Sequence, residues 1–260
     1  MAFPRFLRPG LLLSLILGAG LAAPSLPAAS EADDTKIVEA MRERLVAVQK
    51  QILDSEDPAE QIRLQKSLGA IMDETLPKLS PRTRTPLLIS IRLIQPLQEA
   101  SGAYMKMIAD YSSSGHGDLT TIGSREDIQV RREELRQISA ANQGLIDRLD
   151  RFGHDAEKLL DESDVSAADK RDYLAGLAQG FGRQIGPVRA IRNLDTKMFA
   201  TLTAALNHLD ENWGKWHAVA GSPITWTDGN LEAKFVALID EVSVLAERQT
   251  KAQQALSARL

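Results

Sequence analysis

Histidine and glutamate pairs are the residues of this sequence whose type and spacing most directly suggest chemistry. His154 precedes Glu157 by three positions, and His208 precedes Glu211 by the same interval. Residues three apart share one face of a helix, where imidazole and carboxylate groups can bind a metal ion. Two such pairs on facing helices would form a metal site. His154 also suits a helix end and His208 the boundary of the core, and such pairs arise easily by chance in Glu-rich helices. Metal binding is therefore the least favoured of the functions that the sequence suggests.

The tryptophans form a second candidate site. All three, Trp213, Trp216 and Trp226, lie within residues 213–226, beside His217. We expect Trp213 and Trp216 on one face of a helix and Trp226 in the loop that follows. Indole rings at the end of a bundle can bind a sugar, a peptide or another apolar ligand. The favoured alternative is that Trp226 folds back and closes the end of the hydrophobic core.

A third segment, Gly115-His116-Gly117-Asp118, follows three consecutive serines. A histidine and an acid near a serine could support nucleophilic catalysis. The spacing matches neither a nucleophile elbow nor a phosphate-binding loop, so we expect a flexible loop tip instead. The sequence predicts no catalytic residue and no cofactor, and this favours a binding protein over an enzyme.

The elements that position these residues read as helices throughout the chain after residue 30. Apolar residues recur with the 3.6-residue period of a helix, and no segment shows the alternation of a strand. The pattern predicts an all-α, elongated antiparallel bundle of about six or seven helices, four of them long at about 26–32 residues. The long helices are expected near residues 86–111, 124–152, 187–219 and 231–258. Residues 31–79 should form a helical hairpin that packs on the 86–258 bundle or extends it.

The last helix carries the clearest pattern. Its apolar positions alternate in steps of four and three, as in the heptad seam of a coiled coil. The seam consists of Leu231, Phe235, Leu238, Val242, Leu245, Gln249, Ala252 and Leu256. Polar residues interrupt the apolar stripes at Gln249 and, in an earlier helix, at Arg131 and Asn142. Such residues set the register of helix packing, line a ligand cavity or bind a partner.

Residues 1–30 have the order of a secretory signal peptide. Arg5 and Arg8 are followed by the apolar run 11–17, and small residues at 28–30 precede acidic Glu31. The protein is therefore expected to be exported, to a periplasm or beyond, with residues 31–260 as a single domain. The chain has no cysteine, so lipoprotein attachment and stabilising disulfides are excluded.

Charge and hydropathy narrow the choice of partners. The formal net charge of the 260-residue chain is −4, without the basic excess that general nucleic-acid binding requires. No segment after residue 30 is apolar over the length needed to cross a bilayer. The sequence thus predicts a bundle that binds another envelope protein or self-associates. The alternatives are a ligand-binding bundle with a tryptophan site and, less favoured, a metal-binding bundle.

Overall fold

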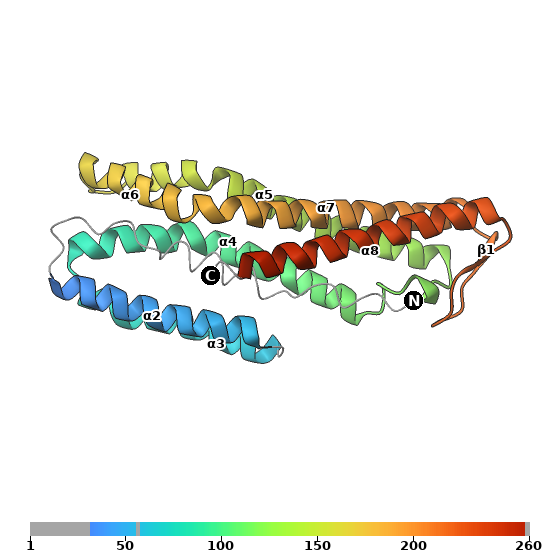
Figure 1. Ribbon diagram of the computed structural model, residues 1–260, viewed down its shortest axis with the longest axis horizontal. Helices are drawn as coiled ribbons and strands as arrows, with labels where there is room; N and C mark the ends of the chain where they lie inside the picture. The colour runs from blue at the N-terminus through green and yellow to red at the C-terminus, as the bar shows by residue number, and fades with distance from the viewer. Residues whose placement is uncertain (1–31, 56–57, 258–260) are drawn as a thin grey trace. The chain divides into compact units, whose positions relative to one another are not determined.

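The computed structural model describes residues 32–55 and 58–257, which form seven α-helices, two 3-10 helices and one short two-stranded ribbon. The predicted all-α helical bundle is confirmed, because almost all regular structure is helical (Figure 1). The sequence pattern gives no indication of the ribbon. The predicted signal peptide, residues 1–30, lies outside the described residues.

The elements follow one another along the chain as helices joined by short connections. The helices are α2 (Ala32–Asp54), α3 (Pro58–Thr75), α4 (Pro81–Ser113), α5 (Arg125–Asp161), α6 (Ala167–Gly180), α7 (Gly182–Glu211) and α8 (Gly229–Ser257), with 3-10 helices η1 (Leu76–Lys78) and η2 (Leu119–Thr121). Strands β1 (Trp216–His217) and β2 (Thr225–Trp226) pair antiparallel. The four longest helices have 33, 37, 30 and 29 residues, in α4, α5, α7 and α8.

Ser124 with Asp127, and Ser166 with Asp169, have the spacing of N-terminal capping pairs and predict a helix start at each, and both starts are found. At the start of α5, Ser124 Oγ accepts the Asp127 N–H at 3.1 Å, and Asp127 Oδ2 accepts the Ser124 N–H at 3.0 Å. At the start of α6, Ser166 Oγ accepts the Asp169 N–H at 3.2 Å. These bonds satisfy N–H groups that have no partner within the first turn of a helix.

Other helix ends differ from the sequence expectation. The sequence predicts that helices break at two prolines, but both prolines lie inside a helix, near its start. Helix α4 begins at Pro81, with Pro86 inside it, and α7 begins at Gly182, with Pro187 inside it. A proline close to the start disturbs only the few residues that precede it. Helix α7 also ends at Glu211, and Gly214 follows with φ of +83°. The expectation that both Trp213 and Trp216 lie on a helix is therefore wrong.

The described residues form two compact units. Unit 1 comprises residues 102–146 and 189–257, and unit 2 comprises residues 32–55, 58–101 and 147–188. The boundaries fall inside α4, α5 and α7, so no linker separates the units along the chain. The single-domain organisation stays a prediction.

Unit 2 contains the expected helical hairpin. Helices α2 and α3 contact each other along apolar stripes. The buried stripe residues are Met41, Leu45 and Ile52 on α2 and Leu64, Leu68 and Ile71 on α3. A buried carboxylate joins this hairpin to α4. Asp34, only 3% exposed, accepts hydrogen bonds from the Ser80 N–H at 3.2 Å, from Ser80 Oγ at 2.5 Å and from Thr83 Oγ1 at 2.6 Å.

Unit 1 places a buried polar cluster where its helices meet. Arg192 and Asp195 of α7 form an ion pair at 2.9 Å, with side chains 2% and 0% exposed. The Tyr104 hydroxyl of α4 donates to Asp195 at 3.0 Å, and Gln249 of α8 donates to the other carboxylate oxygen. The guanidinium also lies over the Tyr104 ring, 4.9 Å from its centroid. Asn142 connects α5 by donating to the Arg192 carbonyl oxygen at 2.9 Å.

The polar cluster explains two of the polar residues that interrupt apolar stripes in the sequence. Asn142 and Gln249 are fully buried and bonded to α7, which supports their interpretation as register residues. The heptad seam of α8 faces the interior around Gln249. Phe235, Val242, Leu245 and Leu256 are buried, and the other apolar seam residues are partly exposed.

We expect Arg192→Met to lower the free energy of unfolding by about 3–5 kcal/mol, because Asp195 would stay buried without its cation. Replacing both partners, as Arg192→Met with Asp195→Leu, should recover much of this loss. The control is Lys251→Met, which breaks an exposed pair with Glu247 and should cost less than about 1 kcal/mol. Urea unfolding measures all three, and an Arg192→Met cost no larger than the control would contradict the prediction.

The Asp34 bonds predict a pH dependence. Hydrogen bonds, foremost from the Ser80 hydroxyl and then from Thr83, hold the pKa of Asp34 below its ordinary value of 3.8, against the opposing effect of desolvation. A carboxyl whose folded pKa is depressed stabilises the fold above its unfolded pKa and loses this contribution as pH falls through the folded pKa. Asp34→Asn should cost about 1–3 kcal/mol at neutral pH and progressively less below about pH 4. Urea unfolding across pH measures this trend, and at neutral pH the control Asp33→Asn, an exposed residue of the same turn, should cost less than Asp34→Asn.

Candidate functional site

The loops of unit 1 bring together several of the residues that the sequence singled out. We call residues 114–124 and 212–228 the loop end. The Gly221 N–H in the second loop donates to Thr120 Oγ1 in the first at 3.1 Å. Beside the loops, Arg132 of α5 pairs with Asp210 of α7 at 2.7 Å, and Arg125 approaches the same carboxylate at 3.4 Å. These contacts hold the two loops and their flanking helices together.

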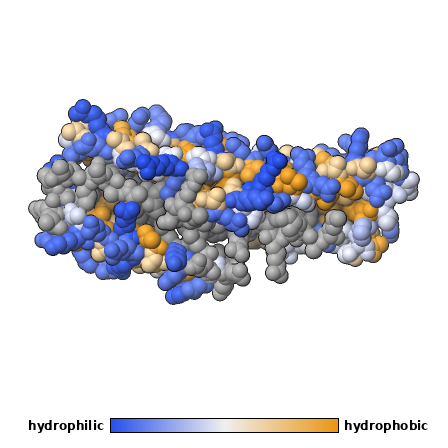
Figure 2. Space-filling model, in the orientation of Figure 1, coloured by the Kyte–Doolittle hydropathy of each residue, from blue (hydrophilic) through white to orange (hydrophobic). Residues whose placement is uncertain are grey.

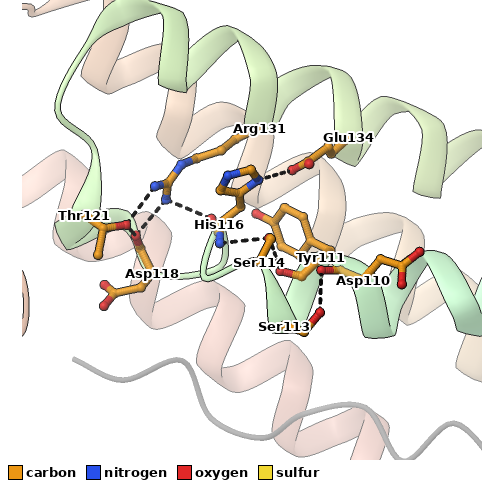
Figure 3. Close-up of polar contacts among 9 residues, drawn as sticks. All are labelled: Asp110, Tyr111, Ser113, Ser114, His116, Asp118, Thr121, Arg131 and Glu134. Atoms are coloured by element: carbon orange, nitrogen blue, oxygen red, sulfur yellow. Dashed lines mark hydrogen bonds and ion pairs between the residues drawn. The ribbon is translucent and has the colours of Figure 1, made fainter.

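The first loop is folded around Arg131, which reaches it from α5 (Figure 3). Its Nη1 donates to the carbonyl oxygens of His116 at 2.8 Å and Asp118 at 2.6 Å, and its Nη2 donates to Thr121 Oγ1 at 2.7 Å. The loop therefore has defined internal bonds, although the sequence suggested only a flexible tip. Gly115 permits the turn, since its φ of +78° is unfavourable for other residues.

His116 in this loop is oriented by a carboxylate. Its Nδ1 lies 2.7 Å from Glu134 Oε2 (Figure 3). This contact orients the imidazole in the way that a carboxylate orients a catalytic histidine. The neighbouring hydroxyls are bonded to the backbone instead of the ring. Ser114 Oγ donates to the Tyr111 carbonyl oxygen at 2.9 Å, and Ser113 Oγ donates to that of Asp110 at 3.0 Å. The arrangement supplies an oriented base but places neither serine on it as a nucleophile.

Two buried groups near His116 keep unused polar atoms. Arg131 is 3% exposed and Tyr111 is 9% exposed. Within the described residues, neither Arg131 Nε nor the Tyr111 hydroxyl has a hydrogen-bond partner. Burial raises the pKa of Tyr111 to about 12, with Glu134 adding to this effect and Arg131 opposing it. Burial lowers the pKa of Arg131. The phenol therefore stays protonated and can donate a hydrogen bond.

The second loop is a short ribbon closed by Trp226. Trp216 of β1 pairs in register with Trp226 of β2. Ring centroids of Trp226 and His208 are 5.2 Å apart, and those of Trp226 and Phe235 are 5.5 Å apart. Trp226 thus lies against the end of α7 and the start of α8, and it stays partly exposed.

The other two indoles differ in their exposure. Trp216 Nε1 donates to the Leu209 carbonyl oxygen at 2.8 Å, which fixes the ring to the end of α7. Trp213 packs edge-to-face on Trp216 at 5.2 Å and is 37% exposed. The Arg125 guanidinium lies 6.0 Å from the Trp213 ring centroid. His217, the fourth residue of the predicted ligand site, is exposed on β1.

Two of the surface hollows among the described residues are not lined by a tryptophan. One in unit 2, of about 280 Å³, lies between α4 and α5, around Pro96 and Phe152. The other, of about 500 Å³, lies between α7 and α8 in unit 1 and includes His208 and Glu211. The tryptophan ligand site stays a prediction.

The proposed metal ligands do not belong to one unit of the described residues. His154 and Glu157 are exposed on α5 in unit 2, whereas His208 and Glu211 belong to α7 in unit 1. His208 Nε2 donates to the Leu231 carbonyl oxygen at 2.9 Å, so this nitrogen already has a partner. Among the described residues, no group of three or more His, Asp or Glu side chains could hold a metal ion.

Sequence reasoning missed the function of Arg131 and the link between the two loops. A signal was present, since Arg131 occupies an apolar stripe position. The pattern could not show that its guanidinium binds loop carbonyls 13 and 15 residues earlier. The Thr120–Gly221 bond, between residues 101 positions apart, has no sequence signature.

Together, the fold and these loops define an all-α helical-bundle protein with an ordered loop end. Searches against models of protein families, curated proteins and solved structures found no match. No helix in the described part of the chain is both long and apolar enough to span a membrane.

We expect Trp226→Ala to lower the free energy of unfolding by about 2–4 kcal/mol, because it removes the ring that packs on His208 and Phe235. Trp213→Ala should cost less than about 1 kcal/mol, since that ring is more exposed. Thermal and urea unfolding of both variants provide the test. Equal costs would contradict the assignment of Trp226 as the ring that anchors the loop.

Proposed function

We propose that this chain is an exported helical-bundle protein that acts by binding another protein of the cell envelope, with the loop end of unit 1 as its recognition surface. Export rests on the signal-peptide pattern of residues 1–30. The choice of binding over catalysis rests on the loop end, where an oriented histidine has no nucleophile bonded to it.

The proposal rests on the positions of the large apolar side chains that unit 1 exposes. Six are exposed in its described residues: Met107, Val130, Trp213, Val219, Val236 and Val244. Trp213 and Val219 belong to the second loop. Met107, Val130 and Val236 lie within about two helical turns of the adjoining helix ends, and only Val244 lies farther away. Figure 2 shows hydrophobic surface at the end of the view where Figure 1 draws β1.

The chemistry of the surface also suits a protein partner. Tryptophan and arginine are the residues most enriched among those that dominate binding energy, and Trp213 lies under the guanidinium of Arg125. The loops that carry this surface are tied down by the Thr120–Gly221 bond and by Trp226. A surface that is ordered before binding loses less conformational entropy when a partner docks.

Photo-crosslinking in the envelope of the native cell tests the proposal. A crosslinker at Val219 should give an adduct with one other protein, and Trp213→Ala should reduce the yield as affinity falls about tenfold or more. The matched control is a crosslinker at Val46, a residue of unit 2 with similar exposure (49% against 53%). Adducts of equal yield at both positions, or a yield that Trp213→Ala leaves unchanged, would contradict the proposal.

A further inference from the structure

The hollow between α4 and α5 in unit 2 has an apolar floor. Leu93 and Leu97 of α4 and Phe152 of α5 line it and are buried. The Phe152 ring stacks on Phe181 with centroids 3.7 Å apart, which fixes its position. The volume of about 280 Å³ is close to the lower limit for small-molecule sites. The hollow therefore suits a small ligand that carries an apolar group.

The rim of the same hollow carries charges of both signs. Its charged residues are Arg92 of α4 and Arg148, Asp155, Lys158 and Glu162 of α5, all exposed. In the described part of the chain, none of the five forms an ion pair or a side-chain hydrogen bond. Three cations and two carboxylates leave one positive charge in excess. Arg148 and Glu162 lie about 21 Å apart along the axis of α5, so a small ligand meets mainly the charges between them.

Opposite charges adjoin along the α5 wall of the hollow. Asp155 precedes Lys158 by three positions, so the two share one face of the helix. The same helix forms an ion pair at this spacing elsewhere, between Glu133 and Arg136 at 2.6 Å. Asp155 and Lys158 form none, so each can contact a ligand. A ligand of one sign would be attracted by one of them and repelled by the other, whereas a ligand with both signs is attracted by both.

The α4 wall also offers one group of each kind. Arg92 supplies a guanidinium, which matches a carboxylate group. Pro96, four residues later, has no N–H to donate to the Arg92 carbonyl oxygen. Both residues line the hollow, so this oxygen can accept a hydrogen bond from a ligand there. The two walls together present cations for a carboxylate and acceptors for an ammonium group.

We infer that the hollow between α4 and α5 binds a free amino acid with an apolar side chain. Its carboxylate would contact Arg92 and Lys158, and its ammonium group would contact Asp155 and the Arg92 carbonyl oxygen. Its side chain would lie on the apolar floor. A free amino acid is the smallest common ligand that combines these three parts. The inference does not depend on the proposed protein partner, whose recognition surface belongs to unit 1.

Calorimetric titration of the full chain at neutral pH tests the inference with three ligands of similar size. L-Phenylalanine carries both charges, 3-phenylpropionate lacks the ammonium group, and 2-phenylethylamine lacks the carboxylate. We expect phenylalanine to bind at one site and each singly charged ligand to bind about tenfold more weakly. The methyl resonances of Leu93, Leu97 and Leu159 should shift in the same titration, because these residues line the hollow.

Substitutions at the rim separate the effects of the two charges. Lys158→Gln should weaken phenylalanine binding about fivefold. Asp155→Asn should weaken phenylalanine binding and strengthen 3-phenylpropionate binding, because the carboxylate attracts an ammonium group and repels an anion. The matched controls are Lys36→Gln and Asp172→Asn, at exposed residues of unit 2 that do not line the hollow. Both controls should leave the affinities unchanged, and all four variants should fold because the residues are exposed.

Three results would each overturn the inference. The first is no saturable binding of phenylalanine up to about 10 mM, a concentration that fills most of a site with a Kd of about 1 mM. The second is that a singly charged ligand binds as tightly as phenylalanine, which would exclude a site for both charges. The third is that the control variants weaken binding as much as the rim variants, which would place the site elsewhere.

Discussion

A charge buried among helices must be compensated inside the protein, and unit 1 is organised around two such charges. Arg192 pairs with Asp195, and the groups that complete this pair come from α4 and α8. Arg131 instead binds the carbonyl oxygens of the loop before α5. The first arginine thus sets how the helices meet, and the second determines how the chain turns between them. Each arrangement follows from the cost of leaving a buried cation without partners.

The loop end gains its order from contacts that join distant parts of the chain. Thr120 accepts the N–H of Gly221, and Trp226 packs on His208 and Phe235. These contacts leave Trp213 and Val219 exposed on a constrained segment. The proposed function depends on this property, because an ordered surface binds with less loss of entropy.

Helix content was predictable because the 3.6-residue period and the capping residues are local signals. The Ser124–Asp127 and Ser166–Asp169 bonds were predicted from spacing and are found in the structure. The errors also had local causes. Pro86 and Pro187 are helix breakers by residue type, yet each lies close enough to a helix start to be tolerated. The candidate site was predicted only in part. The tryptophans were identified, but their division into anchor and exposed ring depends on packing.

The sequence by itself determined the helical class, the inward seam of α8 and the places where polar residues enter apolar stripes. These follow from periodicity, which is a property of neighbours along the chain. Only the tertiary structure decided what those polar residues do: Gln249 completes an ion pair on α7, Asn142 bonds to α7, and Arg131 holds a loop. The physical reason is that the partner of a buried polar group is chosen by distance in space. In unit 1 these partners lie as many as 54 positions away in sequence for Gln249 and as few as 10 for Arg131.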